Sequence, residues 1–211
     1  MFIKLGNVVT AKFLDDLFVA CDDERVAKVV KEFGGKVILT AREHSSGTER
    51  LTEVVNPLDV KVVVNIQGDE PLIHPSTIDS LVRELLDNKD LIVATIIKKI
   101  EKPEEINDQN VVKVVFDKDN FALYFSRSPI PFVRDHVQEY ITYYKHIGLY
   151  GYTKDFLFTY KNLTPTRLEK LEKLEQLRIL EHGYKIKVIE TKHETFGVDV
   201  PEDLEKIRQY I

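Results

Sequence analysis

The sequence contains few of the residues on which several classes of protein depend. It has one cysteine, Cys21, and no tryptophan. A single cysteine excludes an intramolecular disulfide and a cysteine-rich zinc site, which favours a reducing compartment. The longest uncharged apolar run, residues 91–97, is far shorter than the roughly 18–20 residues that a membrane-spanning helix needs. We therefore expect a cytoplasmic protein without membrane insertion.

No charge of one sign dominates the chain. Its 30 basic and 35 acidic residues give a net charge of −5, which disfavours a nucleic acid as partner. The 211 residues are 43% hydrophobic, enough for the core of one sizeable α/β domain. We expect residues 1–211 to form a single domain.

Several motifs of common enzyme classes are also absent. The sequence has no GxGxxG, no GxxxxGK[ST] and no GxSxG, which weakens assignments as a Rossmann dehydrogenase, a P-loop protein or an α/β hydrolase. Its six histidines show no HxH or HExxH spacing, so a zinc site is not expected.

Apolar runs of strand length alternate with segments of helical period, the pattern of a mainly parallel sheet with helices on both faces. The predicted strands are residues 17–21, 36–40, 61–67, 92–98, 111–116, 121–125, 145–152 and 184–190, and the predicted helices are residues 23–33, 48–55, 75–88, 153–160, 165–182 and 201–210. The fold class predicted is α/β and Rossmann-like, with a mixed, mainly parallel sheet, helices on both faces and an antiparallel hairpin extension for dimerisation.

Two of these elements have local signals of their own. Thr164 and Pro165 suit the start of the long helix 165–182 and Gly183 suits its end, with its leucines predicted as core. Residues 117–120 (DKDN) are rich in turn formers and lie between two β-type segments, which predicts an antiparallel hairpin.

Carboxylates follow the apolar run of residues 62–66. Asp69 and Glu70 come at the carboxyl end of this predicted strand, the edge at which open α/β sheets bind ligands. Their oxygens suit Mg²⁺ holding a phosphate, or they cap the next turn. Asp199 precedes Pro201 and suits either a metal ligand or a helix N-cap.

Two further segments carry polar groups that suit a ligand. Ser46, Gly47 and Thr48 precede a predicted helix and could offer N–H groups to an anion or to a base edge, or Thr48 is a plain helix cap. His146, Tyr150 and Tyr152 share one face of a predicted strand, where such rows line a core or an interface in most proteins.

Taken together, these segments resemble the 3-deoxy-manno-octulosonate cytidylyltransferase (CMP-Kdo synthetase) family. The matching strings, in the family's order, are residues 41–50 (AREHSSGTER), 65–71 (NIQGDEP), 112–131 (VKVVFDKDNFALYFSRSPIP), 145–152 (KHIGLYGY), 168–178 (LEKLEKLEQLR) and 197–204 (GVDVPEDL).

The resemblance implies a nucleotidyltransferase that moves CMP from CTP to Kdo, releasing pyrophosphate, for lipopolysaccharide biosynthesis. It implies no protein nucleophile, because positioning and Mg²⁺ drive such a displacement. By motif, Asp69 and Asp199 are the catalytic metal ligands, and Arg42, Ser46 and Gly47 lie beside the cytidine. The residues implied to hold Kdo are Gln67, Arg127, His146, Tyr150, Glu175 and Gln176, with Arg127 and His146 suiting its carboxylate. A homodimer built around residues 111–152 is also implied.

The match departs at the front of the chain. Family members open with a strand and a loop of the type PARxxSTRLxxKPL that cradles the triphosphate, whereas residues 1–12 are MFIKLGNVVTAK. The resemblance begins near Phe13. It therefore implies that the cradle is missing, that the chain as written has little or no activity, and that strands flanking the missing one have exposed edges.

Two alternatives stay open. One is a non-catalytic homologue that keeps dimerisation or sugar binding. The other is a cytidylyltransferase for another sugar acid.

Overall fold

The structure is a computed structural model that describes residues 8–44, 47–68, 70, 72–134, 141–195, 197 and 205. Its strands are β1 (Phe18–Cys21), β2 (Lys36–Leu39), β3 (Val62–Asn65), β4 (Val93–Lys99), β5 (Lys113–Phe116), β6 (Ala122–Ser126), β7 (Tyr144–Thr153) and β8 (Lys187–Glu190). Its helices are the 3₁₀ turn η1 (Val8–Thr10) and α1 (Glu24–Glu32), α2 (Gly47–Val55), α3 (Pro75–Asp87), α4 (Glu104–Asn107), α5 (Lys154–Lys161), α6 (Arg167–Glu172) and α7 (Gln176–Glu181). Within these residues, the structure contains no helix with the length and apolar character that a membrane crossing requires.

Six strands form a mixed sheet around β7. The order is β6-β5-β7-β4-β8, with β3 also paired to β7. β4 and β8 are parallel, but β7 runs antiparallel to β3, β4 and β5. The prediction of a mixed sheet is therefore confirmed, but its description as mainly parallel is wrong for the described strands. The chain returns from the β5–β6 hairpin as one long strand, β7, which lies between β4 on one side and β3 and β5 on the other.

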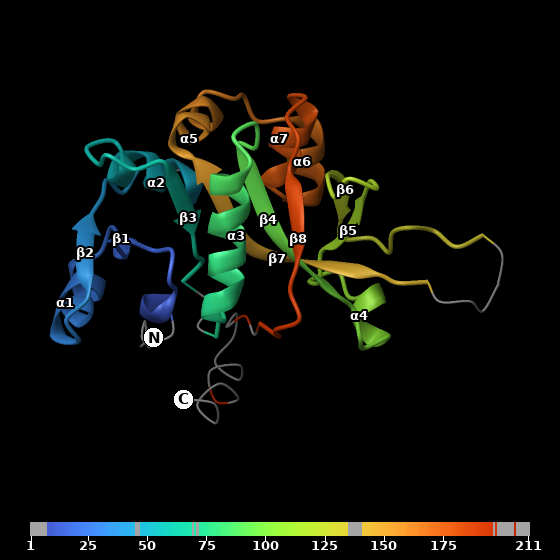
Figure 1. Cartoon of the computed structure of the whole chain (residues 1–211), viewed down its shortest axis with the longest axis horizontal. Coiled ribbons are helices and arrows are strands. Elements are labelled where there is room, and N and C mark those ends of the chain that lie inside the picture. Colours follow the sequence, from blue (N-terminus) through green and yellow to red (C-terminus); the bar gives the residue numbers. More distant parts are fainter. Residues whose placement is uncertain are drawn as a thin grey trace.

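β1 and β2 form a separate parallel pair that packs against α1 (Figure 1). Among the described residues, β1 pairs only with β2 and β3 pairs only with β7. Each of these strands therefore has one edge without a neighbouring described strand.

Helices cover both faces of the large sheet, as predicted. On one face, Ile96 and Leu149 pack with Ile78 and Leu81 of α3, which crosses the front of the sheet in Figure 1. On the opposite face, a second cluster joins the sheet to α5 and α7 through Val93, Tyr152, Leu157 and Leu177. The alternation of side chains along β4 and β7 places successive residues in the two clusters.

A β-bulge interrupts the pairing of β7 with β4. Thr95 pairs with Tyr150 but Ile96 pairs with Ile147, so residues 148 and 149 have no partner on β4. The buried Thr95 hydroxyl fills this irregularity by donating to the Leu149 carbonyl at 2.9 Å. The bulge bends β7 where it passes the cavity described below.

The predicted helix 165–182 is two helices, α6 and α7. The helix is interrupted at Lys173, which adopts a left-handed backbone conformation with φ 56°. Across the break, Arg178 binds the Glu169 carboxylate at 2.9 and 2.5 Å. In one straight helix these residues would lie about 13 Å apart along the axis, so the buried ion pair requires the break. It leaves Leu171, predicted as core, 66% exposed.

The remaining elements follow the predictions to within a few residues at most ends. The β5–β6 hairpin forms as expected, whereas η1 and the short α4 have no counterpart among the predicted elements. The predicted helix 201–210 lies outside the described residues except for Glu205.

Candidate active site

One cavity of about 650 Å³ lies between β7, the start of α2 and the α6–α7 junction. It contains every residue that the resemblance assigned to the sugar: Gln67, Arg127, His146, Tyr150, Glu175 and Gln176. The first and last of these residues, Gln67 and Gln176, are more than 100 residues apart in the sequence. The fold therefore brings the predicted set together in one place.

Two side chains in this cavity carry buried polar atoms without a partner in the described part of the chain. They are the Tyr150 hydroxyl and the Gln176 amide nitrogen. Tyr150 is only 8% exposed and Gln176 only 6%, and burial raises the pKa of Tyr150 well above its usual value, so its hydroxyl is neutral. A buried polar atom without a partner is costly, which indicates that both groups serve a ligand.

His146 is neutral in the folded protein. Its ring packs against Phe125 and Tyr150 at centroid distances of 5.1 and 5.3 Å, and burial lowers its pKa to about 3. Its Nε2 lies 2.9 Å from the Thr95 hydroxyl. Because Thr95 gives its proton to Leu149, Nε2 is assigned as the donor and Nδ1 as an acceptor.

Arg127 is held by two backbone carbonyls. Its Nε donates to the Glu172 carbonyl at 2.8 Å and its Nη1 to the Gln109 carbonyl at 2.9 Å. Among the described residues, Nη2 has no partner, and Arg127 lines the cavity. The guanidinium is therefore fixed in position, and its Nη2 keeps N–H groups that can donate to a ligand.

Glu175 links the two sides of the cavity. Its carboxylate accepts hydrogen bonds from Thr48 of α2 at 3.2 Å and from Tyr160 of α5 at 3.4 Å. Burial raises the pKa of Glu175. Thr48 is the second residue of α2 and uses its hydroxyl here, so its interpretation as a plain helix cap is wrong.

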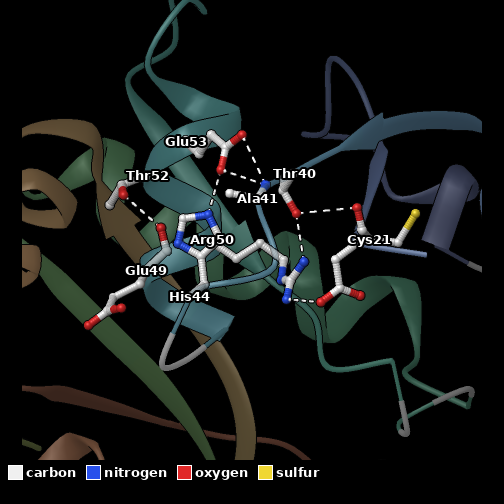
Figure 2. A network of polar contacts seen from close by, with 9 residues as sticks. Cys21, Thr40, Ala41, His44, Glu49, Arg50, Thr52 and Glu53 are labelled. Atoms are coloured by element: carbon white, nitrogen blue, oxygen red, sulfur yellow. Dashed lines mark hydrogen bonds and ion pairs between the residues drawn. The ribbon is translucent and has the colours of Figure 1, made fainter. Parts of the chain in front are cut away.

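A network around Arg50 holds the segment that carries the predicted nucleotide residues (Figure 2). Arg50 reaches from α2 to the Thr40 hydroxyl at 2.6 Å and to the Asp22 carboxylate at 2.8 Å. Glu53 accepts from the Ala41 backbone N–H at 3.2 Å and contacts His44 at 2.5 Å. The ends of β1 and β2 are thereby tied to the first turns of α2.

The predicted nucleotide residues are only partly brought to the cavity. Gly47 lines it, whereas Arg42 is exposed and is not among the described lining residues. Ser46 lies outside the described residues.

Both predicted metal ligands, Asp69 and Asp199, also lie outside the described residues. Their described neighbours Glu70 and Gly197 line the same cavity. Carboxylate oxygens are the donors that Mg²⁺ prefers, so the residue types fit this ion. Within the described ranges, no three acidic, histidine or cysteine side chains are grouped as a metal site would need.

The sequence did not reveal the residues that support the site, namely Thr95, Lys113 and Glu172. One signal was available for Lys113, because it interrupts the apolar run of residues 111–116 at an inward-facing position. Glu172 and Thr95 had no such signal, since their partners are distant in sequence.

Comparison with known proteins agrees with this geometry. Residues 1–188 match the family described as Cytidylyltransferase. The chain is 50% identical over 197 residues to the 3-deoxy-manno-octulosonate cytidylyltransferase of Solibacter usitatus, covering 93% of this chain and 78% of that protein. It is also 50% identical over 199 residues to the enzyme of the same name from Fusobacterium nucleatum, covering 94% and 80%.

A solved structure shares the fold. It is a CMP:2-keto-3-deoxy-manno-octonic acid synthetase complexed with CTP, 40% identical, with a TM-score of 0.91 over 97% of this chain and 84% of that one. A cytidylyltransferase from Leptospira borgpetersenii, 13% identical with a TM-score of 0.61, shares the fold alone. Because residues 1–188 match the family model, half of the aligned residues are shared with two curated enzymes and the fold is shared with a solved synthetase, the chain belongs to the cytidylyltransferase family, among the 3-deoxy-manno-octulosonate cytidylyltransferases.

Proposed function

We propose that the chain transfers CMP from CTP to Kdo, giving CMP-Kdo and pyrophosphate for lipopolysaccharide biosynthesis. The observation that carries this proposal is that Tyr150 and Gln176 each hold a buried polar group with no partner among the described residues, in a cavity that Arg127 also lines. These donors suit a polyhydroxylated acid of sugar size.

Different cavity residues bind different groups of the sugar. The spare donors of Arg127 bind the carboxylate, since a guanidinium suits a carboxylate geometrically. His146 is neutral, with Nδ1 as an acceptor, so it accepts from a sugar hydroxyl. This revises the assignment of His146 to the carboxylate. Glu175, Gln67, Tyr150 and Gln176 take the remaining hydroxyls.

In the reaction, the anomeric hydroxyl of Kdo attacks the α-phosphorus of CTP, and the bond to the β-phosphate breaks. The protein contributes mainly by orienting the two substrates, with Gly47 and Arg42 on the cytidine side and Arg127 on the sugar side. Asp69 and Asp199 would hold Mg²⁺, which neutralises negative charge on the phosphate oxygens when it is bound.

We further propose a homodimer built around residues 111–152. Leu123 on the hairpin and Phe132 beyond it are 62% and 88% exposed. A second copy of the chain would bury these apolar side chains. Sedimentation at micromolar concentration should give twice the mass of one 24.5 kDa chain, and a monomer would contradict this.

The test of function is pyrophosphate release from CTP and MgCl₂ with and without Kdo, beside calorimetric titration with Kdo. The proposal predicts Kdo-dependent release, in contrast to the little or no activity expected from residues 1–12, so this assay decides between the two expectations. Asp69→Asn and Asp199→Asn should lower the release, and the exposed control Asp90→Asn should not. Kdo binding without release would favour the non-catalytic alternative. If a panel of sugar acids shows that the chain prefers a sugar acid other than Kdo, the result would favour a cytidylyltransferase for that sugar acid.

A further inference from the structure

Lys113 in β5 is a lysine without any solvent contact. It is 0% exposed, and its ammonium donates to three backbone carbonyls, those of Asp108 at 2.7 Å, Val111 at 2.6 Å and Arg127 at 2.6 Å. The three N–H groups of the ammonium are thereby all used. Burial lowers the pKa of Lys113, and a cation in such a place is costly unless its bonds serve a purpose.

The three carbonyls belong to two segments that form one wall of the cavity. Asn110 and Val111 line it from one segment, and Arg127 lines it from the other. Between Asp108 and Val111 lies Gln109, whose carbonyl accepts from Nη1 of Arg127. Lys113 therefore fixes both the backbone that carries Arg127 and the loop against which its guanidinium rests.

We propose that Lys113 is a positioning residue for recognition of the sugar's carboxylate: it ties the loop of residues 108–111 to Arg127 so that the guanidinium points its spare donors into the cavity. This rests on the assignment of Arg127 to the carboxylate made above. Direct contact of Lys113 with the sugar is excluded, since its ammonium is enclosed by the three carbonyls and Lys113 does not line the cavity.

The test separates carboxylate recognition from general stability. Kdo and its methyl ester, which has no carboxylate charge, are titrated by calorimetry into the wild-type chain and Lys113→Met. We expect the affinity for Kdo to fall at least about tenfold, while the affinity for the ester stays within about twofold. Equal losses for both sugars, or no loss for either, would overturn the proposal.

A double-mutant cycle tests whether Lys113 affects Kdo binding through Arg127. Lys113→Met should add nothing further in an Arg127→Met background, since both changes remove the same interaction. Additive losses would contradict the proposal. Lys98→Met is the matched control: Lys98 is 2% exposed on β4 of the same sheet, but its partners are the carboxylates of Glu101 and Glu194. It should leave the discrimination between Kdo and ester unchanged. If Lys113→Met does not fold, Lys113→Gln replaces it in the same cycle.

A second measurement needs no sugar. In nitrogen-15 spectra, the Nε–H proton of Arg127, which is bonded to the Glu172 carbonyl, should exchange with water faster in Lys113→Met than in the wild type or Lys98→Met. Unchanged exchange would overturn the positioning role. If the wild-type chain does not bind Kdo, the proposed function fails on that result, while the exchange rate still decides whether Lys113 positions Arg127.

Discussion

Glu172 holds Arg127 at two points. Its carboxylate accepts from the Arg127 backbone N–H at 3.0 Å, and its own backbone carbonyl accepts from the Arg127 Nε at 2.8 Å. The same carboxylate accepts from the Ser126 hydroxyl at 2.7 Å. The last residue of α6 is thereby fastened to the end of β6, which sets the direction of the guanidinium.

Arg127→Lys should weaken Kdo binding about 10- to 100-fold, because a lysine cannot use the Glu172 and Gln109 carbonyls and still present two donors to a carboxylate. Calorimetric titration measures it. Arg167→Lys, an exposed change on α6 outside the cavity lining, should bind Kdo like the wild type. If Arg127→Lys also binds normally, the carboxylate is recognised elsewhere.

Tyr150→Phe should separate stability from binding. Removing a buried hydroxyl that has no partner in the described part of the chain should leave the free energy of unfolding unchanged or raise it by up to about 1 kcal/mol, while Kdo binding weakens. Urea unfolding and calorimetry measure the two effects. Tyr144→Phe, on the same strand but outside the cavity lining, should leave Kdo binding unchanged. A clear loss of stability in Tyr150→Phe would show that its hydroxyl has a partner in the protein.

His146 should make the fold sensitive to acid. In the unfolded chain its imidazole takes up a proton near the ordinary pKa of 6.5, but in the folded protein only at about 3. Its contribution to stability is therefore complete above pH 6.5 and is lost as the pH falls from there toward 3, at up to about 1.4 kcal/mol per pH unit.

His146→Gln should accordingly show a shallower decline of the free energy of unfolding between pH 6.5 and pH 5 than the wild type. Urea unfolding at several pH values measures the slope. Equal slopes in the two proteins would mean that the folded protein protonates His146 as readily as the unfolded chain does.

Arg50→Lys should loosen the nucleotide side of the site. A lysine cannot bond Thr40 and Asp22 with the same geometry, so we expect a melting temperature lower by about 2–4 °C and weaker CTP binding. Arg25→Lys is the control, because the Arg25–Asp23 pair lies at the surface. A variant that melts and binds CTP like the wild type would assign the network in Figure 2 no role in holding this segment.

Local patterns predicted most of the elements. The amphipathic period placed α1 and α3, and the turn-rich residues 117–120 placed the hairpin, because these signals lie within the segments that fold. The direction of β7 could not be predicted in this way, since it depends on which distant strands flank it. The break at Lys173 was equally hidden, because the leucine spacing of residues 168–180 suits a continuous helix.

The residues of the candidate site were likewise predictable only where the signal is local in the sequence. The residues that face the cavity lie in recognisable strings, so the resemblance located Arg127, His146 and Gln176 before the fold was known. Their supports depend on contacts between distant segments, as with Arg127 and Glu172, which are 45 residues apart. Such contacts leave no mark in either local sequence.

The alternation of side chains along β7 has a consequence for how the protein could diverge. His146, Tyr150 and Tyr152 belong to the cavity side, whereas Leu149 belongs to the core beneath α3 and Ile147 contacts both. Substitutions on the first set could retune the choice of sugar acid without disturbing the packing under α3. One strand thus lets the sugar-facing side change while the core beneath α3 stays the same, and the stability cost of a new specificity falls on the other core, where Tyr150 and Tyr152 also pack.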